Sequence, residues 1–240
     1  MDSGAQLTRA GRAVGHDEMV AILGSEILSG ARQPGSRMPN ADDLHERFGA
    51  SRVLMREVTK TLVAKGLVTA KSRVGTHVLG PEYWNWFDSD VLSWRVRLGF
   101  DRKLFEHLAQ MRRAVEPAAA ALAAENRLEQ DIVDLRRALD GMSRAGSDRH
   151  AFSSADLDFH VAVATASGNP LFRSFAAVVE TALRSYFSLS APMHSADIAK
   201  NIEDHARIAD AIEFRDPHTA AEWMLRVIEV GRERVSEQRS

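Results

Sequence analysis

Apolar residues recur with helical spacing along almost the whole chain from Val91 to its end, and no stretch there alternates as a strand would. A glycine stop, an asparagine cap and a proline at the first helical position follow one another at residues 168–170. Helices with one apolar face and short connections pack as an antiparallel bundle. We therefore expect a mainly α chain, with helices near residues 90–98, 101–126, 128–145, 149–167, 170–190, 196–214 and 217–237.

The N-terminal third follows a different pattern, with three short helices before two short strands. Helical spacing from Asp17 ends at a glycine, and the stretch ADDLHERF forms a second helix that ends at Gly49. A third helix follows, and LVTAK and THVL then read as two strands joined at SRVG. Three helices followed by a hairpin predict a winged helix-turn-helix ahead of the helical bundle.

The third helix, within ASRVLMREVTKTLVAKGLV, separates an apolar face from a basic one. Ser51 can cap its first turn, and Arg52, Arg56 and Lys60 recur every four residues beside the apolar stripe. Residues 51–73 include six basic residues and one acidic residue, a pattern that suits either an anionic polymer or a solvated basic face. A helix that enters the major groove uses its N-terminal residues on the bases, and arginine is the commonest reader of guanine.

The stretch PGSRMPNADDLHERFGASRVLMREVTKTLVAKGLVTAKSRVGTHV resembles the DNA-binding domain of the GntR family of bacterial transcription regulators. The resemblance implies that double-stranded operator DNA is the partner. Members often carry a DNA-contacting arginine where this chain has Asp42, so Arg37 or Arg47 is expected to compensate. The predicted DNA-binding residues are Arg37, Ser51, Arg52, Arg56, Lys60, Arg73 and Gly75.

The predicted bundle contains polar residues on otherwise apolar faces. Asp156 and His160 lie four residues apart on one helix and therefore share a face. His205 lies among isoleucines two helices later, and Arg112 is followed one turn on by Glu116. Because buried polar groups are costly unless satisfied, these residues predict a polar site inside the bundle.

Three interpretations of this polar site follow from the residues. Asp156, His160 and His205 could hold one divalent metal such as Zn²⁺, with a bound ligand completing the shell. They could instead bind a polyol directly, with Arg112 as the partner of a carboxylate, because a guanidinium matches two oxygens. They could also be a structural cluster in which Arg112 pairs with Glu116. A hydrolytic zinc site lacks a recognisable general base, so we do not expect an enzyme.

Residues 90–235 resemble the effector domain of the FadR-type branch of the GntR family, known as the FCD domain. The resemblance implies a metal held by one aspartate and three histidines, with an arginine for a carboxylate effector. Asp156, His160 and His205 match three ligand positions, Arg112 matches the arginine, and Val227 stands at the fourth ligand position, where it cannot bind metal. NWFDSDVLSW and LAQMRRAVEPAAAALAAE are similar to sugar-acid regulators of this branch, which implies a galactonate-like aldonate as effector.

The predicted organisation is a flexible tail (1–15), a winged helix-turn-helix domain (16–80), an aromatic linker (81–95) and an effector-binding and dimerisation domain (96–238). The chain has no cysteine, which excludes disulfides and thiolate metal ligands. No apolar run approaches the roughly 18–20 residues of a membrane span. These features fit a cytoplasmic protein, and the resemblance implies a homodimer that represses sugar-acid catabolism genes until a small carboxylate releases it.

Overall fold

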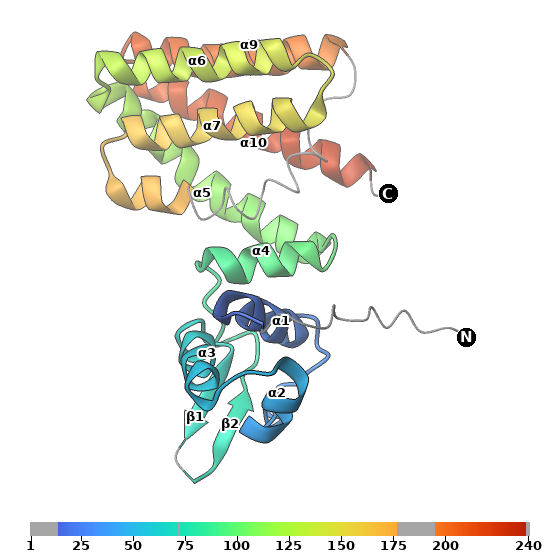
Figure 1. Ribbon diagram of the computed structural model, residues 1–240. Coiled ribbons are helices and arrows are strands. Elements are labelled where there is room, and N and C mark those ends of the chain that lie inside the picture. The colour runs from blue at the N-terminus through green and yellow to red at the C-terminus, as the bar shows by residue number, and fades with distance from the viewer. Residues whose placement is uncertain (1–13, 72, 177–194, 239–240) are drawn as a thin grey trace. The chain divides into compact units, whose positions relative to one another are not determined.

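The computed structural model describes residues 14–71, 73–176 and 195–238. Its contacts divide the chain into two compact units, with the boundary between Leu98 and Gly99 (Figure 1). The first unit contains α1 (His16–Leu28), α2 (Ala41–Phe48), α3 (Arg52–Ala64), β1 (Val68–Lys71), β2 (Gly75–Val78) and α4 (Ser89–Arg97). The second contains α5 (Arg102–Asn126), α6 (Glu129–Ala145), α7 (Arg149–Ala166), α9 (Ser195–Glu213) and α10 (Pro217–Gln238).

The predicted fold class, a winged helix-turn-helix followed by an all-α bundle, is confirmed. Among the described residues, the observed helix ends of the second unit lie within one residue of the predicted ones. A further helix begins at Pro170, and the remainder of the helix predicted over 170–190 lies outside the described residues beyond residue 176. No helix in the described ranges is long and apolar enough to cross a membrane.

Capping residues fix the two ends of α2 and the start of α3. The Asn40 side chain accepts hydrogen bonds from the backbone N–H groups of Asp42 and Asp43, and the Asp43 side chain accepts one from the Asn40 N–H. Gly49 then ends α2 in the left-handed conformation, with φ of 65°. The Ser51 hydroxyl accepts from the N–H of Leu54 and starts α3.

The two strands form an antiparallel hairpin with Val68 opposite Val78 and Lys71 opposite Gly75. An isolated bridge between Arg37 and His77 adds a third short extended segment to its edge. The apolar faces of the helices and the hairpin enclose one core, which includes Met19, Leu23, Ile27, Leu44, Phe48, Met55, Val58, Leu62, Leu67 and Val78.

Helix α4 packs on α1 within the first unit. The Trp94 ring lies against Gly24, where a Cβ atom would come within 2.4 Å of the ring carbon Cζ3. Lys65 follows α3, and its buried Nζ lies 2.8 Å from carboxylate oxygens of Asp88 and of Asp90. Asp88 is also the N-cap of α4. The segment predicted as an aromatic linker thus contributes a helix that is tied to the DNA-binding fold.

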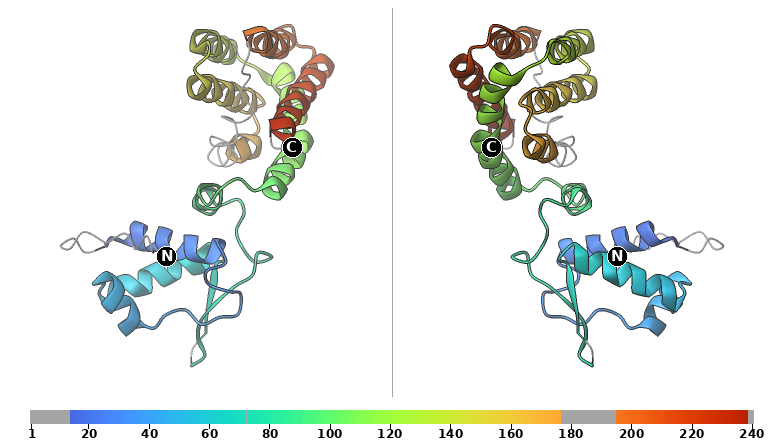
Figure 2. Two further views of the ribbon diagram at one scale, coloured as in Figure 1. Left: turned by 90° about the vertical axis from the view of Figure 1, so that its right-hand side faces the viewer. Right: turned by 90° about the vertical axis from the view of Figure 1, so that its left-hand side faces the viewer.

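The second unit is a bundle in which α5 packs against α7, α9 and α10, and α6 packs against α7 and α9. Figure 2 shows several of these helices nearly end-on. Asp101 and Asp148 cap the starts of α5 and α7 through two backbone N–H groups each. The interior is lined by apolar residues that include Ala120, Leu135, Met142, Phe159, Ile208, Ile212 and Met224.

A Gly24→Ala change is expected to destabilise the first unit by about 1–3 kcal/mol, because the added methyl displaces the Trp94 ring from α1. Gly231→Ala is the matched control, since a Cβ there meets nothing within 4 Å and the helix gains about 1 kcal/mol from the better helix former. Denaturant titration followed by tryptophan fluorescence measures both variants. Equal effects of the two changes would contradict the close packing of α4 on α1.

Candidate functional site

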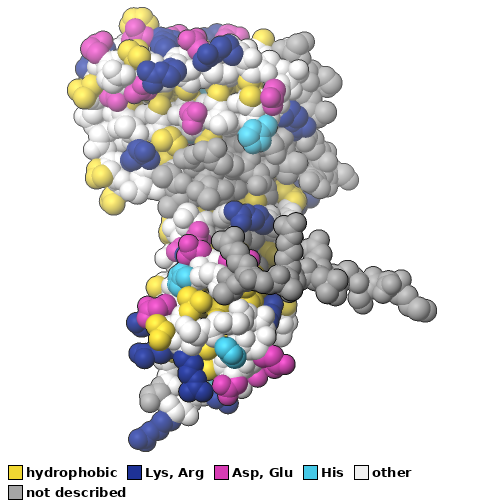
Figure 3. Space-filling view, in the orientation of Figure 1, with side chains coloured by type: hydrophobic (Ala, Val, Ile, Leu, Met, Phe, Trp, Pro, Cys, Tyr) yellow, Lys and Arg dark blue, Asp and Glu magenta, His cyan; other side chains and the backbone are white. Residues whose placement is uncertain are grey.

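The exposed face of α3 carries the first candidate site. Ser51, Arg52, Arg56 and Lys60 are all exposed, and Lys and Arg side chains gather along one edge of the first unit (Figure 3). Arg52 lies 3.6 Å from Asp42 on α2, and both side chains are more than four-fifths exposed. An ion pair in water contributes little, so Arg52 can exchange this carboxylate for a phosphate or a base edge.

The hairpin carries the other predicted DNA-binding residues. Arg73 and Gly75 both have positive φ, 66° and 101°, so the tip turns sharply there. Arg37 packs over Gly75, with its Nε 3.1 Å from the position of a Cβ. Arg47, by contrast, pairs with Glu26 and stacks on Phe48. Of the two arginines expected to compensate for Asp42, Arg37 is therefore the one beside the hairpin tip.

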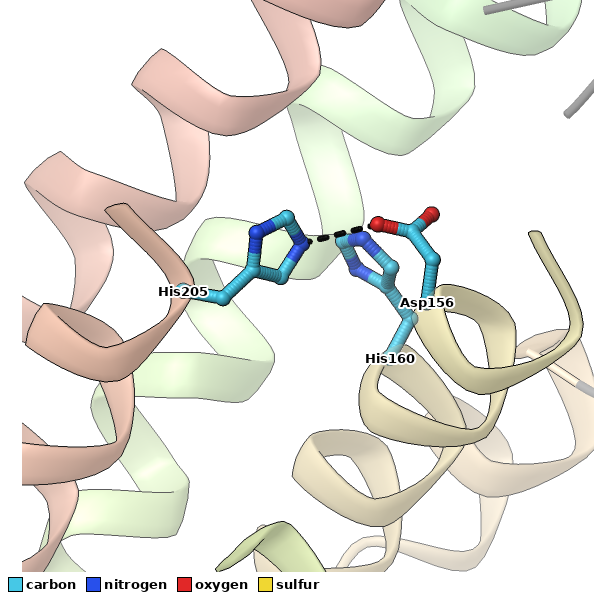
Figure 4. A group of neighbouring side chains, drawn as sticks. All are labelled: Asp156, His160 and His205. Atoms are coloured by element: carbon cyan, nitrogen blue, oxygen red, sulfur yellow. Dashed lines mark ion pairs between the residues drawn. The ribbon is translucent and has the colours of Figure 1, made fainter. Parts of the chain in front are cut away.

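The second candidate site lies inside the bundle, where α7 and α9 bring three polar side chains together (Figure 4). Asp156 and His160 come from α7 and His205 comes from α9, and all three are buried. One ligand atom of each lies within 4.8 Å of the others. The structure thus gathers the residues that the sequence analysis placed on two separate helices.

The ring of His205 lies between a backbone carbonyl and a carboxylate. Its Nδ1 donates a hydrogen bond to the backbone carbonyl of Asn201, one turn earlier on α9, at 2.8 Å. Its Nε2 lies 3.0 Å from Oδ1 of Asp156, which is an ion pair when the ring carries its second proton. Either a proton or a metal ion at Nε2 satisfies this contact.

Arg112 and Glu116 on α5 complete the polar network. The guanidinium donates from Nε to Oε1 of Glu116 at 2.5 Å and from Nη2 to Oε2 at 3.2 Å. Oε2 of Glu116 lies 2.8 Å from Nδ1 of His160, and Nη2 of Arg112 lies 3.2 Å from Nε2 of the same ring. Glu116 therefore sits between the arginine and the histidine, and the pairing of Arg112 with Glu116 considered from the sequence is present.

The charges of this network favour the ionised forms despite burial. Burial alone would raise the pKa of Glu116, but Arg112 and His160 outweigh burial and lower that pKa to about 2. Burial would likewise raise the pKa of Asp156, and His205, His160 and Arg112 together lower it. The buried cluster thus holds two carboxylates that stay ionised at neutral pH beside one guanidinium.

Two family models cover both units. Residues 16–78 match the bacterial regulatory proteins of the gntR family, and residues 107–230 match the FCD domain. The chain is 32% identical over 221 residues to the galactonate operon transcriptional repressor of Escherichia coli, which covers 92% of this chain and 96% of that protein.

This chain belongs to the GntR family of transcription regulators, with an FCD domain.

One further relative is similar in sequence to this chain, and two solved structures share its fold. The regulator is 28% identical over 217 residues to the Uxu operon regulator of Haemophilus influenzae, which covers 87% of this chain and 77% of that protein. Its fold matches that of Lar, which controls expression of the Listeria monocytogenes agr system, with a TM-score of 0.63, 18% identity and coverage of 95% and 99%. E. coli McbR/YncC matches with a TM-score of 0.52, 18% identity and coverage of 95% and 100%.

Asp156, His160 and His205 offer three donor atoms for a metal in this GntR regulator, although Nε2 of His160 also lies 3.2 Å from Nη2 of Arg112. A metal-bound histidine commonly donates its other ring nitrogen to a carbonyl or a carboxylate. His205 does so to Asn201, and His160 is placed to do so to Glu116. The fourth family position, Val227, is buried and apolar on α10 and supplies no ligand atom. Zn²⁺ would therefore be held by three side chains, with the remaining coordination position open to an effector or to water.

The sequence analysis did not predict that Glu116 would join Arg112 to His160. The only signal in the sequence was the four-residue spacing from Arg112, which predicts a helical ion pair and says nothing of α7. The contact depends on how α5 and α7 pack, and the spacing within one helix does not carry that information.

Arg112→Met is expected to destabilise the second unit by about 3–5 kcal/mol, because Glu116 then stays buried without its guanidinium. The double variant Arg112→Met with Glu116→Leu is expected to recover most of that loss, since no buried charge is left without its partner. Denaturant unfolding of the two single variants and the double variant measures the coupling. If the loss of unfolding free energy in the double variant equals the sum of the two single losses, the two residues do not act as a buried pair.

Proposed function

We propose that this GntR regulator represses genes of sugar-acid catabolism and leaves its operator when a galactonate-like aldonate binds inside the FCD domain. The observation that carries the proposal is the buried polar cluster in which Arg112 contacts His160, beside Asp156 and His205. A guanidinium matches a carboxylate, and acceptor groups match hydroxyls, so the set suits a hydroxylated acid. The name of one relative, the galactonate operon transcriptional repressor of Escherichia coli, supports the same class.

The carboxylate of the effector would reach Arg112 by sharing or replacing Glu116 on the guanidinium. Because Arg112 also contacts Nε2 of His160, a change in its partners alters how that ring is held. His160 and Asp156 are one turn apart on α7, so binding at Arg112 is coupled to the position of α7. An effector shifts the regulator between states only by as much as it binds one state better.

The DNA-binding side of the proposal places α3 in the major groove, with Ser51, Arg52 and Arg56 on the bases and phosphates. Lys60, Arg37 and the hairpin tip at residues 73–75 would contact the flanking backbone. A homodimer on an operator with two related half-sites is the arrangement that suits two such domains.

A second candidate is a regulator that senses a different carboxylic acid through a bound metal. The observation that favours it is the cluster of three ligand atoms within 4.8 Å. In that case Asp156, His160 and His205 would hold the metal and the acid would complete its shell.

Arg56→Ala is expected to weaken binding to an operator that the wild-type protein selects from random DNA. The loss is about 1–3 kcal/mol for a base-reading arginine, or roughly fivefold to more than a hundredfold in affinity. Arg137→Ala on α6 removes the same charge from an exposed surface of the other unit and is expected to leave the affinity unchanged. Fluorescence anisotropy measures both variants, and circular dichroism confirms that they fold. Wild-type affinity in Arg56→Ala would rule out α3 as the reading helix.

Galactonate at about 100 times its dissociation constant is expected to add ~2.7 kcal/mol of stability, or on the order of 5–10 °C in Tm. The thermal-shift measurement is made once with Zn²⁺ and once with a chelator. A shift that persists in chelator supports a metal-free pocket, and a shift lost in chelator supports the second candidate. No shift from any sugar acid in either buffer would contradict the proposed effector class.

A further inference from the structure

Two buried polar atoms on one face of α9 lack hydrogen-bond partners. They are Nε2 of His205, whose residue is fully buried, and Oδ1 of Asn201, whose residue is 7% exposed. These are two of the four such atoms among the described side chains, and they lie one helical turn apart. Residues four apart share a helix face, so Asn201 lies on the same inward face as His205.

The two atoms differ in what can satisfy them. Nε2 of His205 lies 3.0 Å from Oδ1 of Asp156, and a protonated ring donates to that carboxylate. The carbonyl oxygen of the Asn201 carboxamide cannot donate and needs a donor. Among the described residues none supplies it, so this oxygen is a buried acceptor without a partner.

An unsatisfied buried acceptor costs free energy, and such a group in a native fold calls for an explanation. The interior around α9 is otherwise lined by apolar residues such as Ile208 and Ile212. A leucine at position 201 would suit that lining better than an amide whose oxygen lacks a hydrogen-bond partner. The amide is explained if a ligand supplies the donor that the protein lacks.

We propose that Asn201 is a further effector-binding residue, whose carboxamide oxygen accepts a hydrogen bond from a hydroxyl group of the bound acid. This inference rests on the proposed function and deepens it, because it makes hydroxyl groups, and not the carboxylate alone, the basis of recognition. A site built to pair with a hydroxyl rejects an analogue that lacks it, since the acceptor is then buried unpaired. The effector is accordingly a polyhydroxylated carboxylic acid, and a hydroxyl-free acid of the same length binds poorly.

The test compares galactonate with hexanoate, a six-carbon acid without hydroxyl groups, on the full-length protein. Isothermal titration is run in whichever of the zinc and chelator buffers gives the tighter wild-type binding. Asn201→Leu is expected to weaken galactonate binding about tenfold or more, because a hydroxyl loses its acceptor, and to leave hexanoate binding unchanged. Asn201→Ser, which keeps an acceptor, is expected to fall between leucine and wild type.

The stability of the ligand-free protein separates a binding role from a structural one. Since the Asn201 oxygen is unpaired without ligand, Asn201→Leu is expected to keep or raise the Tm of the ligand-free protein. Asp197→Asn, an exposed change one turn earlier on α9, is the control and is expected to alter neither Tm nor affinity.

The outcomes distinguish this inference from the proposal on which it rests. Wild-type galactonate affinity in Asn201→Leu would overturn the role of Asn201 and leave the sugar-acid proposal intact. A lowered Tm of the ligand-free leucine variant with an unchanged preference for galactonate over hexanoate would show that the amide is structural. A wild-type protein that binds neither galactonate nor other aldonates would contradict the proposed function itself, and the inference with it.

Discussion

The ion pair between Arg112 and Glu116 is the interaction on which the interior of the second unit depends. It places a guanidinium inside an apolar bundle, at a cost that only a close carboxylate can offset. Glu116 also contacts His160, so the same carboxylate fixes one ring of the pocket. The pocket is thus built by α5 and α7 around one pair of charges, and α9 adds His205 from the other side.

This construction leaves the buried polar cluster unevenly satisfied. On the side of α5 every charge has a partner, and Glu116 remains ionised because Arg112 and His160 outweigh its burial. On the side of α9, the described part of the chain leaves the side-chain oxygen of Asn201 without a donor. A hydroxylated acid supplies a carboxylate for the first side and hydroxyl donors for the second. A metal ion would supply a partner only for the acceptors on the α9 side, since it offers no carboxylate to Arg112.

Much of this architecture could be predicted because it depends on local sequence patterns. The caps at Asn40 and Ser51, the glycine after α2 and the spacing of Asp156 and His160 depend on residues within one turn of each other. The docking of α4 on α1 could not be predicted, because it depends on the Trp94 ring meeting a glycine seventy residues away. The contact of Glu116 with His160 and the unpaired oxygen of Asn201 could not be predicted for the same reason. Each depends on which neighbouring helix supplies, or does not supply, a partner.

The proposed function requires that the acid bound in the FCD domain and the operator bound by the winged helix-turn-helix weaken each other's binding. The most direct measurement is the dissociation constant of the operator with and without saturating galactonate, together with that of galactonate with and without operator. Linkage requires the two ratios to be equal, and we expect each ligand to weaken the other at least tenfold, a coupling of about 1.4 kcal/mol. An operator affinity that is unchanged by saturating galactonate would contradict the proposed function.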